Sequence, residues 1–166
     1  MGKGLEIERK FLVRIPDFEN LDVRRKLTIL QTYLNDGENG IQRRVRRISE
    51  NGNIHYIYTE KLFLTAITRQ EMEYEIDENE YNRLIVYARK DYKPINKTRY
   101  CFDYSGQLFE IDVYPFSDRL AIMEIELASE TQEIIFPDNV DVVMEVTGNH
   151  GYSNSSLANA GAFPEI

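Results

Sequence analysis

Charged residues at every second position are the feature of this chain best suited to chemistry. The first example is the segment 5–11, in which Glu6, Glu8 and Lys10 alternate with other residues. Successive side chains of a β-strand point to opposite faces, so two carboxylates and an ammonium group would share one face. Carboxylates bind hard divalent cations and ammonium groups bind anions. Such a face could therefore hold a metal ion and an anionic ligand together.

The same spacing recurs through most of the chain with both signs of charge. Seven further segments carry it: Arg44 and Arg46, Thr59 and Lys61, Arg69 to Glu75, Lys97 and Arg99, Glu110 and Asp112, Glu124 and Glu126, and Glu145 and Thr147. Roughly eight strands suffice to close a barrel whose interior can hold a small ligand. The alternative is an ordinary sheet with these charges in water and a core on the other side.

Two observations favour charged faces that converge on an interior. Both basic and acidic segments occur along the chain, and the opposite faces carry much of its apolar content. Apolar faces turned to water would expose more hydrophobic surface than soluble monomers usually do. We therefore expect an α+β, mainly β fold, a closed eight-stranded antiparallel β-barrel with a charged lumen and a few flanking helices.

Composition predicts one domain over residues 1–166 without a membrane segment. The chain has 166 residues, 42% of them hydrophobic, and no apolar run approaches the roughly 18–20 residues of a membrane span. Charged residues from Glu6 to Lys10 occupy the place of a signal-peptide core, so we expect none. Cys101 is the only cysteine, which excludes an intrachain disulfide. These features predict a cytoplasmic protein.

The net charge and the available metal-binding side chains limit the kinds of partner and metal ion that the protein can bind. The net charge of -8 argues against nucleic acid, because phosphate backbones select basic surfaces. One cysteine and two histidines exclude a CxxC zinc site, so any metal must be a hard cation held by carboxylates. A small polyanion remains possible as a ligand if the cations are gathered on one inner face.

Local signals add helices and turns around the strands. Asp77 and Glu80 form a capping pattern, and apolar spacing predicts a helix over 77–89. A short helix is predicted over 22–27, and a hairpin turn at Asn51-Gly52. We expect a last helix within 152–160, either in one mouth of the barrel or outside it.

The charged segments together resemble the CYTH superfamily, also called triphosphate tunnel metalloenzymes. Glu6-Ile-Glu8-Arg-Lys10 matches its ExExK signature, and the later motifs follow in the family's order: Gln31-Thr-Tyr33-Leu34, Arg44-Val-Arg46, Thr59-Glu-Lys61, Glu73-Tyr-Glu75, Lys97-Thr-Arg99-Tyr100, Glu110-Ile-Asp112, Glu124-Ile-Glu126 and Glu145-Val-Thr147-Gly148. ExExK alone is a weak pattern, whereas the ordered set covers nearly the whole chain. The resemblance implies a tunnel that binds triphosphate-containing substrates with Mg²⁺ or Mn²⁺.

This resemblance implies a role for each group of charged residues. The expected phosphate ligands are Lys10, Arg44, Arg46, Lys61, Lys97 and Arg99. The expected metal ligands are Glu6, Glu8, Asp112, Glu124 and Glu126, and the acids expected to hold nearby cations are Glu73 and Glu75. Tyr33 and Lys10 are the catalytic candidates. Tyr33 is a general base if nearby cations lower its pKa, or else a hydrogen-bond donor or packing residue.

The hypothesised reaction is metal-assisted attack of water on a terminal phosphorus. Inorganic tripolyphosphate is the favoured substrate, because no obvious base-recognition element is visible. A class IV-type adenylate cyclase, a thiamine triphosphatase and a non-catalytic polyphosphate-binding module remain alternatives. A homodimer is compatible with the pattern.

Overall fold

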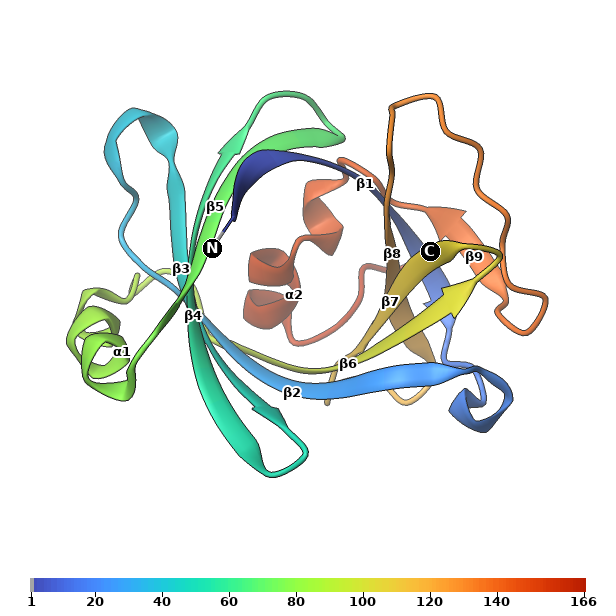
Figure 1. Cartoon of the computed structure of the whole chain (residues 1–166), viewed down its shortest axis with the longest axis horizontal. Helices are drawn as coiled ribbons and strands as arrows, with labels where there is room; N and C mark the ends of the chain where they lie inside the picture. Colours follow the sequence, from blue (N-terminus) through green and yellow to red (C-terminus); the bar gives the residue numbers. More distant parts are fainter. Residues whose placement is uncertain (1) are drawn as a thin grey trace.

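Residues 2–166, which the computed structural model describes, form nine antiparallel strands in one sheet (Figure 1). The strands are β1 Gly2–Arg14, β2 Val23–Tyr33, β3 Gln42–Glu50, β4 Asn53–Phe63, β5 Thr68–Ile76, β6 Ile95–Tyr104, β7 Gln107–Val113, β8 Leu120–Glu126 and β9 Val142–Glu145. Their order is β5-β4-β3-β2-β6-β7-β8-β1-β9, and β5 also pairs with β1. This last pairing closes eight strands into the expected barrel, with β9 as an additional strand.

Strand β1 closes the barrel by pairing on both of its edges. Its first half, from Gly2 to Ile7, pairs with β5, while Glu8 to Arg14 pairs with β8. Beyond the end of the β5 pairing, residues 11–13 pair with β9. The long alternating segment at the start of the chain therefore touches three other strands, which places its charged face at the seam of the barrel.

The outer face of the barrel is covered by loops and one short helix. A core cluster that includes Phe11, Phe109 and Met123 packs beneath apolar residues of the segments 15–21 and 134–140. A second cluster, with Val45 and Tyr58, lies under helix α1, Glu78–Leu84. The apolar faces of the strands are thus buried outside the lumen, as the sequence pattern predicts.

Helix α1 confirms the predicted cap but is shorter than predicted. The carboxylate of Asp77 accepts a hydrogen bond from the backbone N–H of Glu80 at 2.8 Å. The α-helix ends at Leu84 and a 3-10 helix follows over Ile85–Tyr87. The helix predicted over 22–27 is wrong, because residues 23–27 form the start of β2, which pairs with β6. Long-range strand pairing overrides local helix propensity there.

The tail of the chain folds back into one end of the barrel. Helix α2, Asn154–Ala160, follows a 3-10 helix over His150–Tyr152 and lies inside the ring of strands in Figure 1. Its Leu157 is buried against inward-facing residues near that end, including Leu12, Tyr114 and Ile122. Of the two expected positions for the tail helix, the structure has the one in the mouth.

A different apolar cluster occupies another part of the lumen. Leu27, Ile29 and Ile48 are buried together, with Ile57 packed against them. Strand alternation puts Ile29 on the same face as Gln31, whose side chain lines the central cavity. The charged middle of the barrel is therefore bounded by α2 on one side and by this apolar floor on the other. No helix within residues 2–166 is long and apolar enough to cross a membrane.

Candidate active site

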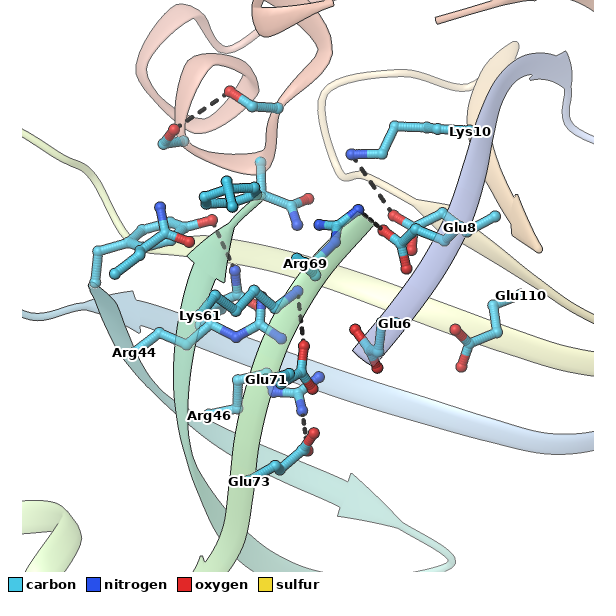
Figure 2. Close-up of a pocket in the computed structure, with 18 of the residues that line it drawn as sticks. Glu6, Glu8, Lys10, Arg44, Arg46, Lys61, Arg69, Glu71, Glu73 and Glu110 are labelled. Atoms are coloured by element: carbon cyan, nitrogen blue, oxygen red, sulfur yellow. Dashed lines mark hydrogen bonds and ion pairs between the residues drawn. The ribbon is translucent and has the colours of Figure 1, made fainter. Parts of the chain in front are cut away.

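All eight barrel strands contribute side chains to a central cavity of about 310 Å³. Equal numbers of acidic and basic residues line it. The acids are Glu6, Glu8, Glu71, Glu73, Glu110, Glu124 and Glu126, and the bases are Lys10, Arg44, Arg46, Lys61, Arg69, Lys97 and Arg99. In Figure 2, Arg44, Arg46 and Lys61 lie on one side, and Glu6, Glu8 and Glu110 on the other. The alternating charged faces therefore converge on an interior, as predicted.

The acidic side places glutamates of neighbouring strands at opposed positions. Glu8 on β1 lies directly opposite Glu126 on β8, and Glu124 on β8 lies opposite Glu110 on β7. Opposed residues of an antiparallel pair point to the same face, and like charges in such positions are destabilising. Glu8 is partly compensated by Arg69, whose Nη2 lies 2.6 Å from its Oε1. The arrangement favours a cation between the carboxylates.

Burial and neighbouring acids disfavour ionisation on this side. Burial, followed by a hydrogen bond with Glu71, raises the pKa of Glu6 to about 8. Burial and then the charge of Glu124 raise the pKa of Glu8. Both effects follow from gathering carboxylates away from water without enough positive charge.

These carboxylates fit a divalent cation that is bound together with a substrate. Within residues 2–166, no three His, Cys, Asp or Glu side chains converge to form a complete metal site. Mg²⁺ commonly takes one or two protein carboxylates and completes its coordination with waters and phosphate oxygens. Oxygen-only donors in opposed pairs supply that kind of partial site.

The basic side contains one arginine that is buried without an acidic partner. Arg46 forms an ion pair of 2.5 Å with Glu73, and Lys61 forms one of 3.2 Å with Glu71. Arg44 is only 8% exposed, yet it has no ion pair within the described part of the chain, and its Nε has no hydrogen-bond partner there. A buried guanidinium group is costly unless it is paired. Arg44 therefore indicates that an anion belongs in the cavity.

Two further cations are held by Asp112. Lys97 donates to its Oδ2 at 2.8 Å, and Arg99 donates to both carboxylate oxygens. Burial lowers the pKa of Lys97 to about 8 despite the opposing charge of Asp112. Asp112 itself is not part of the cavity lining. The expected metal ligand Asp112 is thus already engaged on both oxygens, and its geometry is that of a residue which positions Lys97 and Arg99.

The two catalytic candidates both face the cavity. Lys10 on β1 approaches Glu124 on β8, with Nζ and Oε1 3.7 Å apart. Tyr33 on β2 accepts a hydrogen bond from Gln31 at 2.9 Å. Burial raises the pKa of Tyr33 and outweighs the charge of Arg44, so the expected lowering is wrong. The hydroxyl of Tyr33 is therefore protonated at neutral pH, which favours the hydrogen-bonding alternative over the general base.

Several other charged side chains do not reach the central cavity. Glu75 is exposed near the end of β5 and is not brought to the cavity. Glu145 pairs with Arg9 outside the lumen. Arg9, Arg43, Arg47 and Glu60 have the opposite parity to the lumen residues of their strands, and they are absent from the lining.

Several cavity residues were not assigned as ligands from the sequence. Strand alternation already placed Arg69 and Glu110 on the charged faces, but no role was assigned to either residue. Gln31 and Gln42 are uncharged and gave no charge signal. Ser153, Asn154 and Ser155 reach the cavity only because the tail folds back into the barrel.

A second hollow of about 490 Å³ adjoins the central cavity and shares Glu8, Lys10 and Arg69 with it. Its outer part is lined by the β4–β5 connection, including Leu64 and Thr65, and by the segment 146–150. This hollow lies beside α2 and gives the charged site a way out to the surface.

Comparisons with known proteins agree with this architecture. The model of the CYTH domain family matches residues 4–158. An inorganic triphosphatase of Acetivibrio thermocellus is 35% identical over 157 residues, which is 93% of each chain. The crystal structure of the inorganic triphosphatase NE1496 is similar with a TM-score of 0.58 and 32% identity, covering 96% of this chain and 97% of that one.

A more distant structure shares the fold. The PH1819 protein from Pyrococcus horikoshii OT3 matches with a TM-score of 0.59 and 21% identity, over 76% of this chain and 80% of that one. The family match spans nearly all of the barrel strands and the tail that enters the barrel. The closed barrel, the charged lumen and these matches agree, and the chain belongs to the CYTH domain family.

Proposed function

We propose that this protein is a divalent-metal-dependent hydrolase that splits inorganic tripolyphosphate into diphosphate and phosphate. The observation that carries the proposal is Arg44, a buried arginine in a charged cavity without an acidic partner among the described residues. Two relatives that carry the name inorganic triphosphatase support the substrate class. A compact polyanion with many acceptor oxygens is the kind of ligand that such a cavity suits.

The basic residues bind and orient the substrate. Arg44 and Arg46 on β3 and Lys61 on β4 face the cavity from adjacent strands, so they can hold neighbouring phosphate oxygens. Lys97 and Arg99, fixed by Asp112, add donors from β6. Donors held in place before the reaction stabilise charge that develops on the transferring phosphoryl group and on the leaving diphosphate.

The acidic residues provide the place for the cation. Glu6 and Glu8 on β1 would hold it together with Glu124 and Glu126 on β8. A divalent ion bound there supplies Lewis-acid stabilisation of the phosphates and lowers the pKa of a water molecule. Lys10 lies beside Glu124 and can contact a phosphate oxygen next to that site. Asp112 pairs with Lys97 and Arg99, and Glu73 pairs with Arg46, so these two acids position basic side chains. Glu75 has no part in the site.

The test measures turnover with and without metal. The purified protein is incubated with tripolyphosphate or with ATP, in EDTA, Mg²⁺ or Mn²⁺, and the products are resolved by anion-exchange chromatography. We expect diphosphate and phosphate in equal amounts from tripolyphosphate, only when metal is present. Cyclic AMP and diphosphate from ATP would favour the cyclase instead. Tight binding without turnover would favour the non-catalytic module.

A pair of arginines on the same strand provides a matched control. Arg44→Gln removes the unpaired buried cation, and kcat/KM should fall by about 100-fold or more, since a charge-assisted contact to phosphate is lost. Arg47 is exposed on the outer face of β3, so Arg47→Gln should leave kcat/KM unchanged. Equal activity of the two variants would contradict a substrate role for Arg44.

A further inference from the structure

Two glutamines of the described structure are buried, and their hydrogen bonds differ. Gln107 is 9% exposed and both ends of its amide are bonded to the backbone of Ile135, at 2.8 and 3.1 Å. Gln31 is 0% exposed, its Nε2 donates to the hydroxyl of Tyr33 at 2.9 Å, and its Oε1 has no partner among the described residues. Buried polar atoms are normally paired, so the free end of Gln31 calls for a ligand.

The free end of Gln31 belongs to a group of unpaired atoms in the cavity. Gln31 lies opposite Arg46 on β3, and Tyr33 lies opposite Arg44. The Nε atoms of both arginines also lack hydrogen-bond partners within the described residues. All four side chains line the same cavity. One anionic group placed between them could accept hydrogen bonds from both Nε atoms, and from Nε2 of Gln31 if the amide turns that end toward the anion.

We propose that Gln31 is a substrate-binding residue that contacts the same phosphate group as Arg44 and Arg46, and that Tyr33 positions its amide. The proposal rests on the function proposed above. In the complex the amide is turned by 180°, so that Nε2 donates to a non-bridging phosphate oxygen. The hydroxyl of Tyr33 then donates to Oε1, and every atom of the pair has a partner. Tyr33 suits this role because it keeps its proton.

The surroundings of Gln31 also determine which phosphate it contacts. Ile29 precedes Gln31 on the same face of β2, and Ile48 follows Arg46 on the same face of β3. Both isoleucines belong to the apolar floor of the lumen. A phosphate at Gln31 therefore has hydrocarbon directly beyond it and no room for an ester substituent. Gln31 thus recognises an unsubstituted terminal phosphate.

The test measures binding of tripolyphosphate to the full chain by titration calorimetry in EDTA, without turnover. Gln31→Met keeps the length of the side chain but removes its donor, and should raise Kd by about 10-fold or more. Gln31→Glu should weaken binding at least as much, because a carboxylate repels phosphate. Tyr33→Phe should raise Kd by a smaller factor. The double variant Gln31→Met with Tyr33→Phe should bind like Gln31→Met alone, because Tyr33 acts through Gln31.

Two controls keep the outcomes distinct. Gln107→Met removes a buried amide outside the cavity, so it should lower the Tm and leave Kd within about twofold. Arg44→Gln reports on the site itself. Weak binding by Arg44→Gln with normal binding by both Gln31 variants would overturn the role of Gln31 and leave the proposed function intact. Normal binding by all of these variants would refute the phosphate site. Additive losses in the double variant would overturn positioning by Tyr33.

Discussion

Lys97 and Asp112 form an ion pair of 2.8 Å in which both side chains are only 1% exposed. The second cation on Asp112, Arg99, donates from Nε at 2.8 Å and from Nη2 at 3.0 Å. Bringing three charges out of water costs several kcal/mol per ion, and mutual pairing offsets that cost. The stability of each of these three buried charges therefore depends strongly on the other two.

Removal of the Asp112 charge should destabilise the protein even without metal. Asp112→Asn leaves Lys97 and Arg99 buried and undercompensated, so the free energy of unfolding should fall by about 3 kcal/mol. Urea denaturation in EDTA measures the change. Asp103→Asn, which breaks an exposed pair with Arg24, serves as control and should cost about 0.5 kcal/mol or less. A small change in the free energy of unfolding of Asp112→Asn, together with weaker metal binding, would indicate that Asp112 is a metal ligand.

The opposed glutamates Glu8 and Glu126 should lower the stability of the metal-free protein while they support metal binding. Glu126→Gln removes one of two facing charges, so the Tm in EDTA should rise by about 1–3 °C. Metal-dependent hydrolysis of tripolyphosphate should fall at the same time. Differential scanning calorimetry and phosphate release measure the two effects. Glu133→Gln, at an exposed position outside the cavity, should change neither. A lower Tm for Glu126→Gln would show that this carboxylate is compensated in the metal-free protein.

The ion pair that joins β9 to β1 should weaken in acid. Arg9 donates two hydrogen bonds to Glu145, at 2.8 and 2.7 Å, which lowers the pKa of this carboxyl. Because the folded-state pKa lies below the unfolded value, the stabilisation is present at neutral pH and is lost as pH falls through the folded value. At pH 7, Arg9→Gln should lower the Tm by about 2–4 °C, as expected for a partly exposed bidentate pair.

This difference should shrink at pH 3, below the ordinary pKa of a glutamate carboxyl, and in 1 M NaCl, where the pair is screened. Arg9 also stacks over Phe11, with 5.4 Å from Cζ to the ring centroid, and that contribution does not depend on pH. Arg14→Gln, at an exposed arginine of the same strand, is the matched control. An effect of Arg9→Gln that stays constant between pH 7 and pH 3 would assign it to packing on Phe11 alone.

Cys101 should be unreactive in the folded protein. Its side chain is 5% exposed, and burial, followed by the charge of Glu110, raises the pKa of the thiol to about 11. At pH 8 its reaction with a disulfide reagent should therefore be roughly 100-fold slower than in the urea-unfolded chain. Absorbance of the released thiolate measures both rates. Labelling of the native protein at the unfolded rate would show that β6 and β7 separate at this position.

Strand elements of the fold could be predicted because their signals are local. The period of two between Glu6, Glu8 and Lys10 holds within a single strand, and strand β1 carries it into the cavity. The turn between β3 and β4 was also local, since Asn51 and Gly52 adopt positive φ values of 52° and 80°. The start of β2 was misassigned because its strand conformation depends on pairing with β6, far along the chain.

The sequence by itself determined which residues could meet in the cavity, because alternation assigns every side chain of a strand to one face. It could not determine which cations would be left without an acid. Arg44 and Arg46 are both arginines on the inner face of β3, yet only Arg46 pairs with an acid, Glu73, in the described structure. The acidic partner of each lysine or arginine depends on the register between strands, which pairs residues far apart in the chain. Only the tertiary structure decides these partners, because the pairing of β1 with β5 closes the barrel and fixes which charged side chains face one another across the lumen.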